Sequence, residues 1–310
     1  MDIFIQILLL IVGFTMLVKG ADWFVDGTSG IAERFGIPQL VIGLTIVAMG
    51  TSAPEAAVSI TAGLKGNAGI TIGNVVGSNI LNILIILGIT AVITRVAIQK
   101  STLRYEIPYM IFITIVMIAM GMTGEQISFV EGIVLWILFI AYLIYLFIMA
   151  KQGKTEHEEE EKDESIWKLI LFSIVGIVLI VWGSDVTVDS ATSLARIFGL
   201  SERFIGLTVV ALGTSLPELF TSVNAAIKGK ADIAIGNIVG SNLFNILFVI
   251  GTTALITPVV FETKFVIDAI IAVAAGVLLW ISVFRTKQLR RPWGIIMLVS
   301  YAAYFVYLMV

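Results

Sequence analysis

The chain has 310 residues, of which 58% are apolar and only 13% are charged, and its mean hydropathy is +1.04. Soluble domains carry about 25% charged residues, so this composition excludes a large soluble catalytic domain and a nucleic-acid-binding protein. The absence of cysteine excludes a disulfide-stapled secreted fold, and the net charge of −3 adds no basic surface for nucleic acid. The sequence predicts an integral protein of the lipid bilayer.

Apolar segments in chain order predict ten transmembrane helices, because a helix needs about 20 apolar residues to cross the hydrocarbon core. They lie near residues 3–28, 38–64, 69–94, 105–122, 128–150, 166–192, 201–227, 232–257, 264–284 and 292–310. The first segment lacks the basic flank and the cleavage site of a signal peptide, so we expect it to be a span. The predicted fold class is therefore an all-α membrane protein.

The loops between these segments differ in basic charge. With the N-terminus outside, the cytoplasmic loops hold fourteen lysines and arginines and the opposite loops hold four. By the positive-inside rule we expect a multi-pass protein of the cell membrane with both termini outside and a cytoplasmic central linker, residues 151–165. The acidic run in this linker could bind Ca²⁺, but it lacks EF-hand spacing, which favours a solvated connector.

The chain contains an internal duplication. Residues 41–84 align without a gap on residues 204–247, and 27 of these 44 positions are identical. The linker thus joins two repeats, residues 1–150 and 166–310. Each repeat holds five predicted spans, an odd number, so the second enters the membrane in the opposite direction. Inverted repeats are typical of secondary transporters, whose substrate site lies near the midplane where the repeats meet.

Two glutamates, Glu55 and Glu218, occupy the middle of the second and seventh spans. A charged side chain at that depth costs about 2.5–3.5 kcal/mol and normally faces a partner or a water-filled pathway. No lysine or arginine lies near the centre of either span. Two carboxylates without a protein counter-ion require a cation or protons, so we expect a cation site.

Helical spacing adds further oxygen ligands. The faces that carry the two glutamates, and the faces of the third and eighth spans, present Ala48, Thr51, Ser52, Ala211, Thr214, Ser215, Asn74, Ser78, Asn82, Asn237, Ser241 and Asn245. Pro54 and Pro217 should break their helices and free the carbonyls of Gly50 and Gly213. Such an all-oxygen set suits Ca²⁺, with smaller pockets for Na⁺, better than transition metals.

Some of these polar residues have a structural alternative. Small residues in membrane helices often serve close packing, and Asn79 and Asn242 could pack or bind ions. Asp22 and Asp26 lie toward a helix end, where solvation at the membrane interface explains them without a function.

The paired motifs GTSAPE…GNVVGSNILN and GTSLPE…GNIVGSNLFN resemble the two alpha repeats of the sodium/calcium exchanger family, within the calcium/cation antiporter superfamily. The resemblance implies exchange of Ca²⁺ for Na⁺ by alternating access, with the first and sixth spans sliding against the others. It implies that Glu55 and Glu218 bind Ca²⁺ and share Na⁺, with the carbonyls of Thr51 and Thr214 as further Ca²⁺ ligands. One Na⁺ site would comprise Ala48, Ser52 and Ser78, its mate Ala211, Ser215 and Ser241, and Asn82 and Asn245 would close the centre.

One position departs from part of that family. Some relatives, including potassium-dependent ones, carry aspartate at the position of Asn245, so the asparagine implies K⁺-independent exchange. The chain also lacks a large cytoplasmic regulatory insert and so resembles a minimal prokaryotic member. We expect no cofactor beyond the transported ions.

Three other functions compete with this hypothesis. A H⁺/Ca²⁺ exchanger would use the same glutamates as proton carriers, although the hydroxyl pockets beside them favour sodium. A passive cation channel is disfavoured by a deep site between inverted repeats. An intramembrane enzyme is disfavoured because no serine has a histidine or lysine partner. The sequence leaves the oligomeric state open.

Overall fold

The computed structural model describes residues 3–64, 69–152, 165–198 and 211–309. Within these ranges seven helices are long and apolar enough to cross a membrane, and a bent pair of helices makes an eighth candidate. Most of the linker and the first ten residues of the seventh predicted span lie outside the described residues. The prediction of an all-α membrane fold is confirmed.

The first repeat begins with a long helix and continues through helices that are interrupted by single π-helical turns. Its elements are α1 (Ile3–Phe35), α2 (Gln39–Ile42), η1 (Gly43–Val47), α3 (Ala48–Thr51), α4 (Ala53–Leu64), α5 (Gly69–Leu81), η2 (Asn82–Leu87), α6 (Gly88–Ile93), β1 (Val96–Ala97), η3 (Thr102–Glu106), α7 (Ile107–Met122), β2 (Gln126–Ile127) and α8 (Phe129–Gln152).

The second repeat follows the same order. Its described elements are α9 (Ile166–Ile197), α11 (Ala211–Thr214), α12 (Leu216–Ile227), α13 (Ala231–Phe244), η5 (Asn245–Ile250), α14 (Gly251–Ile256), β3 (Val259–Val260), α15 (Thr263–Phe284), β4 (Gln288–Leu289) and α16 (Arg291–Met309). The two longest helices, α1 and α9, both continue beyond the ends predicted at residues 28 and 192.

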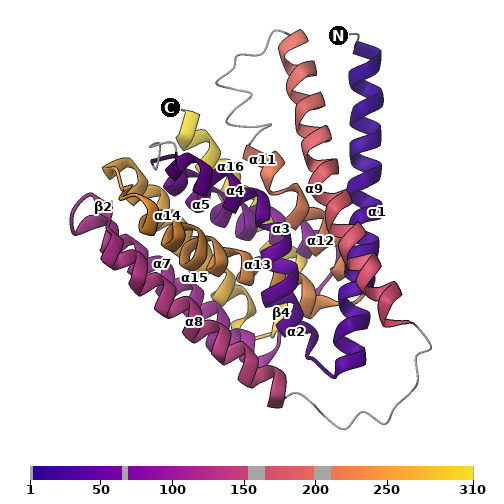
Figure 1. The fold of residues 1–310 in the computed structure, drawn as a ribbon, viewed down its shortest axis with the longest axis horizontal. Coiled ribbons are helices and arrows are strands. Elements are labelled where there is room, and N and C mark those ends of the chain that lie inside the picture. The colour runs from indigo at the N-terminus through magenta and orange to yellow at the C-terminus, as the bar shows by residue number, and fades with distance from the viewer. Residues whose placement is uncertain (1–2, 65–68, 153–164, 199–210, 310) are drawn as a thin grey trace.

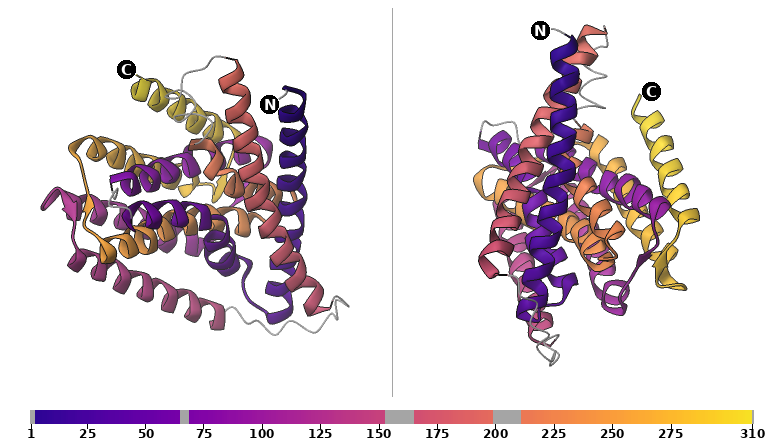
Figure 2. Two further views of the ribbon diagram at one scale, coloured as in Figure 1. Left: turned by 45° about the horizontal axis from the view of Figure 1, so that its top comes forward. Right: turned by 90° about the vertical axis from the view of Figure 1, so that its right-hand side faces the viewer.

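Helices α1 and α9 form a pair on one flank of the molecule, steeply inclined to the other helices (Figures 1 and 2). Glycines allow this close approach. A Cβ atom at Gly176 would lie 2.5 Å from the backbone nitrogen of Phe24 and 2.8 Å from the carbonyl oxygen of Gly20. A Cβ atom at Gly183 would lie 3.0 Å from the Gly13 carbonyl oxygen. The pair therefore meets backbone against backbone at Gly176, while at Gly183 the Met16 Cβ atom is nearest, at 2.8 Å.

The centre of the molecule is built from the two motif helices that follow the glutamates. The apolar segment of α13 to α14 is 94% buried inside the protein, whereas that of α1 is 22% buried. Lipid rather than protein must cover most of α1, because its apolar surface has no other solvent compatible with it. The segment of α5 to α6 is also central, so the duplicated motifs meet in the core.

The two repeats interlock at both ends through short antiparallel strands. Strand β1 of the first repeat pairs with β4 of the second, and β2 of the first pairs with β3 of the second. The hydropathy pattern predicts only helices and loops here, because two-residue strands are too short to show a period.

A charged cluster ties α1 to the end of α12. The Nζ atom of Lys228 lies 2.5 Å from Asp22 and 2.7 Å from Asp26, so interfacial solvation alone is the wrong explanation for these aspartates. Burial would lower the pKa of the Lys228 ammonium, but its hydrogen bonds to both carboxylates outweigh this and raise the pKa. The pairing thus joins α1 to the C-terminal end of α12.

We predict that Gly176→Ala lowers the thermal stability of the purified protein by several degrees. The new methyl group must displace backbone of α1, and overpacking of this kind costs about 1–3 kcal/mol. Gly73→Ala is the matched control, because its Cβ atom would meet only Phe265, at 3.4 Å. Equal melting temperatures for the two variants would contradict the tight α1–α9 contact.

Candidate functional site

The site begins at two helix breaks near the middle of the membrane. The helical path bends by 51° between α3 and α4, and Ser52 lies at the bend with φ −83° and ψ 7°. Ser215 has nearly the same conformation, φ −94° and ψ 6°, between α11 and α12. The breaks therefore lie between Gly50 and Pro54 in one repeat and between Gly213 and Pro217 in the other.

The two glycine carbonyls at these breaks differ from expectation. Proline removes the N–H that would bind each of them in a regular helix, and we expected free ligands. Instead, the Gly50 carbonyl accepts a hydrogen bond from a backbone N–H at the end of α3. The Gly213 carbonyl accepts a hydrogen bond from the side-chain hydroxyl of Ser184, at 2.6 Å. The breaks shape the site, but in this conformation these two carbonyls are already hydrogen-bonded.

The carboxylates cross between the repeats. Ser52 Oγ of the first repeat donates to Glu218 Oε1 at 2.7 Å, and Ser215 Oγ of the second approaches Glu55 Oε1 at 3.4 Å. Both glutamates are 1% exposed. The second oxygen of each, Oε2, is buried without a hydrogen-bond partner. Each repeat thus orients the carboxylate of the other and leaves one oxygen available.

A layer of four asparagines lies beside the carboxylates. Asn79 and Asn242 donate to each other's backbone carbonyl, both at 3.2 Å. Asn82 donates its amide N–H to Asn242 Oδ1 at 3.0 Å, and Asn245 donates to Asn79 Oδ1 at 3.2 Å. Asn82 and Asn245 each donate one amide N–H in these bonds, and their Oδ1 atoms stay buried without a partner. The contacts favour a positioning role for Asn79 and Asn242, which the sequence left undecided.

A second pair of asparagines braces the backbone of the glutamates. Asn74 Nδ2 lies 3.3 Å from the Glu55 carbonyl oxygen and 2.9 Å from Ser59 Oγ. The second repeat matches this at 3.4 and 2.8 Å with the equivalent Asn237, Glu218 and Ser222. Ser59 and Ser222 were not among the predicted residues. Each stands four residues after a glutamate in the duplicated segment, and this shared spacing could have predicted their place beside the site.

The flanking pocket beside Ser52 has a different composition from the expected one. We grouped Ser78 with Ala48 and Ser52, but it is Ser241 Oγ that approaches the Ala48 carbonyl, at 3.4 Å. The reason is that α13 of the second repeat lies along η1 and α3 of the first, whereas α5, which carries Ser78, packs against α11. Ser241 of the second repeat therefore lies beside Ala48 of the first.

Thr51 and Thr214 end the half-helices that precede the breaks. The Thr51 hydroxyl bonds the Val47 carbonyl at 3.1 Å and Asn237 Oδ1 at 3.0 Å. Its side chain is thus engaged in holding α3 against α13.

Four oxygens of the two repeats are buried without a hydrogen-bond partner: Oε2 of Glu55 and Glu218 and Oδ1 of Asn82 and Asn245. They lie on elements that pack together, α4 against η5 and α12 against η2. Buried polar atoms are almost always paired. A cation would supply the missing partner of two carboxylates and two amides on packed elements of both repeats, whereas other unpartnered atoms such as Glu106 Oε2 stand outside this set. In the described part of the chain no group of three or more His, Cys, Asp or Glu could hold a metal. The arrangement therefore suits a hard cation bound by carboxylate, amide and hydroxyl oxygens.

Comparison with known proteins identifies the family. The family model described as sodium/calcium exchanger protein matches residues 5–148 and 168–310. The chain belongs to this family. It is 33% identical to the sodium/calcium exchanger MaX1 of Methanosarcina acetivorans, with 98% of both chains covered, and 35% identical to the inner membrane protein YrbG of Escherichia coli, with 93% of this chain and 92% of the relative covered.

A solved structure shares the whole architecture. The sodium-calcium exchanger NCX_Mj, soaked with zero Na⁺ and Ca²⁺, superimposes with a TM-score of 0.86 at 31% identity, over 99% of this chain and 100% of that one. The sequence-based family assignment is confirmed, and the fold is that of a membrane exchanger.

We predict that Glu55→Gln and Glu218→Gln each weaken Ca²⁺ binding about hundredfold or more, because each removes a buried charge that faces the cation. Glu106→Gln is the matched control. Glu106 is also 1% exposed and its Oε2 is also without a partner, but it lies in η3 and its Oε1 accepts from the Tyr145 hydroxyl of α8. Calorimetric titration of the purified variants measures the affinities. Unchanged Ca²⁺ affinity in either of the first two variants would contradict the site.

We also predict that Asn79→Ala weakens Ca²⁺ binding about tenfold without removing a ligand. The substitution frees the amide nitrogen of Asn245 and lets its side chain turn, and loss of such support typically costs 10–100-fold in affinity. The same titration measures it, with melting temperature as the check on folding. An affinity equal to that of the parent protein would mean that Asn79 only packs.

Proposed function

We propose that this protein is a secondary active antiporter that exchanges Ca²⁺ for Na⁺ across the membrane. The observation that carries the proposal is the set of four unpartnered oxygens shared by the two repeats. Two glutamates balance the charge of one Ca²⁺, and the amide oxygens add neutral ligands at the centre. The names of MaX1 and NCX_Mj, both sodium/calcium exchangers, support the same ion pair.

Sodium would bind at smaller pockets that reuse the same carboxylates. Ser52 and Glu218 are in contact at 2.7 Å, and Ser241 approaches the adjacent Ala48 carbonyl. A hydroxyl, a carbonyl and one carboxylate oxygen suit a monovalent ion. In the second flanking pocket, Ser215 stands beside Glu55, with Ser78 and Ala211 on the elements that pack there. Since both ions need Glu55 and Glu218, their binding is mutually exclusive, as antiport requires.

Alternating access would use the close packing on one side of the site. A Cβ atom at Gly240 would lie 2.8 Å from the Leu44 carbonyl oxygen, and one at Gly236 would lie 3.0 Å from the Gly43 Cα atom. The half-helix that leads to Ser52 therefore lies directly on α13. This contact would close the path between the site and the cytoplasm, the side to which we assign the start of this half-helix. Glycines let α1 and α9 approach closely along their length, and we propose that this pair moves as a unit against the other helices.

A H⁺/Ca²⁺ exchanger remains the second candidate, because protons compete for buried carboxylates at any cation site. Lowering the pH should then weaken Ca²⁺ binding in both mechanisms. Only coupling distinguishes them. The amide of Asn245, where some potassium-dependent relatives carry aspartate, supports exchange without K⁺.

The decisive measurement is ⁴⁵Ca²⁺ uptake into proteoliposomes without K⁺. We predict uptake that requires internal Na⁺, that is absent with internal choline, and that an imposed proton gradient does not restore. Glu55→Gln should abolish this uptake and Glu106→Gln should preserve it. Uptake driven by protons alone would establish the second candidate, and uptake without any gradient of counter-ion would show a passive channel.

A further inference from the structure

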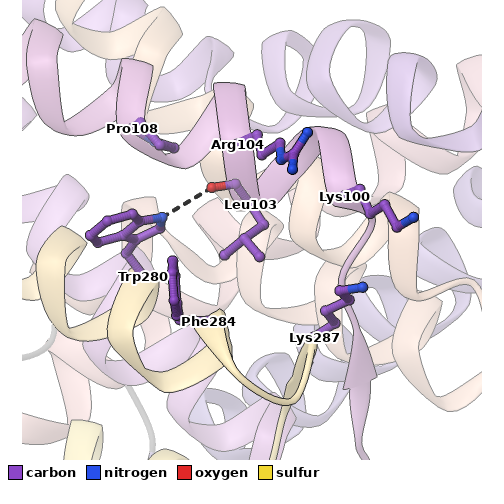
Figure 3. Close-up of a pocket in the computed structure, with 7 residues that line it drawn as sticks. All are labelled: Lys100, Leu103, Arg104, Pro108, Trp280, Phe284 and Lys287. Carbon is purple, nitrogen blue, oxygen red and sulfur yellow. Dashed lines mark hydrogen bonds between the residues drawn. The ribbon is translucent and has the colours of Figure 1, made fainter.

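A pocket of about 400 Å³ lies between the start of α7 and the end of α15, and none of the residues with the four unpartnered oxygens lines it. Its lining combines positive charge with apolar and aromatic surface: Lys100, Leu103, Arg104, Pro108, Trp280, Phe284 and Lys287. Figure 3 shows the lysines and Arg104 toward one side of the pocket and Trp280 on the opposite side. No acidic residue lines it.

The wall of the pocket is fixed by a π-helical turn. In η3 the Ile107 N–H bonds the carbonyl of Thr102 rather than that of Leu103. The released Leu103 carbonyl accepts the indole N–H of Trp280 at 3.0 Å (Figure 3). This bond joins η3 to α15 across the pocket and holds the Trp280 ring in place. The pocket is therefore built before any ligand arrives.

The rim of the pocket contains a residue in an unfavourable backbone conformation. Lys287 has a φ of 49°, a left-handed value at which glycine or asparagine is the usual residue. Its N–H bonds the Val283 carbonyl at 2.8 Å, and its own carbonyl accepts from the Ile98 N–H at 2.9 Å. The second bond draws Lys287 toward the segment that carries Lys100. A lysine at a position that suits glycine indicates that the side chain has a use.

The inverted repeat supplies an internal comparison at the opposite end of the molecule. Glu125, the residue before β2, has a φ of 54°, and its carbonyl accepts from the Phe261 N–H at 2.8 Å. The turn is thus the same, but glutamate replaces Lys287. The positions equivalent to Trp280 and Phe284, counted back from the end of α7, are Ile118 and Met122. The backbone is shared by both repeats, whereas the basic and aromatic side chains are specific to one.

We propose that this pocket binds the phosphate headgroup of an anionic glycerophospholipid from the cytoplasmic leaflet. Lys100, Arg104 and Lys287 would hold the phosphate, since basic pockets between membrane helices on that side bind acidic headgroups. Pro108, Trp280 and Phe284 would contact the glycerol and the upper acyl chains. Phe284 is 55% exposed, so apolar surface continues out of the pocket toward lipid. A free anion would leave that surface unused.

The first test measures binding of phosphatidylglycerol to the detergent-purified full-length protein by native mass spectrometry. Combining Lys100→Gln, Arg104→Gln and Lys287→Gln should weaken binding about hundredfold, at about fivefold per charge. The control combines Arg95→Gln, Arg285→Gln and Arg290→Gln, which removes equal charge from exposed residues of the same predicted face that do not line the pocket. Equal losses in the two triple variants would overturn the proposal in favour of diffuse attraction.

A second variant separates the side chain from the turn. Lys287→Gly suits the left-handed backbone, so the melting temperature should stay equal or rise, while phosphatidylglycerol binding falls about fivefold. If Lys287 served only the turn, binding would be unchanged, and the proposal would lose its central residue.

Two competitors define the ligand. Phosphatidylcholine should bind at least tenfold more weakly than phosphatidylglycerol, and millimolar inorganic phosphate should not displace the bound lipid. Displacement by inorganic phosphate would identify a site for a free anion, and equal binding of the two lipids would identify a site for acyl chains. Either result would overturn the assignment. The test does not depend on ion exchange, so it stands apart from the proposed function.

Discussion

Two carboxylates buried in the membrane without a protein counter-charge are the constraint on which the rest of this structure depends. Glu55 and Glu218 cannot be left to water at that depth, and no arginine or lysine is bonded to either of them in the described residues. The protein answers with hydroxyl donors from the opposite repeat and leaves one oxygen of each carboxylate for a cation. Under the proposed function such a site is incomplete without its ion, so exchange for another cation would cost less than loss of the ion.

Support for these ligands comes from neutral amides. Asparagine can donate and accept at the same time, so one amide can orient a neighbour and still carry no net charge. In the asparagine layer, Asn79 and Asn242 accept hydrogen bonds from the amides of Asn245 and Asn82. The side-chain oxygens of Asn82 and Asn245 stay buried without a partner. Aspartate at such a position would add a ligand charge and change the number or valence of cations that balance the site. The choice of amide therefore bears on selectivity as well as on geometry.

Much of this arrangement could be predicted from the sequence because the chain is duplicated. Identical polar residues at identical spacing identified the motif helices, both glutamates and the asparagines of the centre. What the pattern could not give was which helix of one repeat lies against which helix of the other. The contact of Ser241 with the Ala48 carbonyl was therefore not predicted, since helical periodicity describes one helix at a time. The hydrogen bonds of Gly50 and Gly213 were missed for another reason. The Gly50 carbonyl is bonded by backbone at the end of its own half-helix, and the Gly213 carbonyl by Ser184 on α9 of the same repeat, and residue spacing reveals neither bond. The π-helical turns and the two-residue strands leave no periodic signal at all.

The pairing of β1 with β4 and of β2 with β3 has a consequence for biogenesis. The short strands of each repeat, and its asparagine Asn79 or Asn242, have their hydrogen-bond partners in the other repeat. The ribosome delivers the first half to the membrane before the second exists, so the early half must wait with unpaired backbone at both faces. Insertion of the spans and assembly of the fold are therefore separate events in time, and the molecule can acquire its native contacts only after the last helices have entered the bilayer.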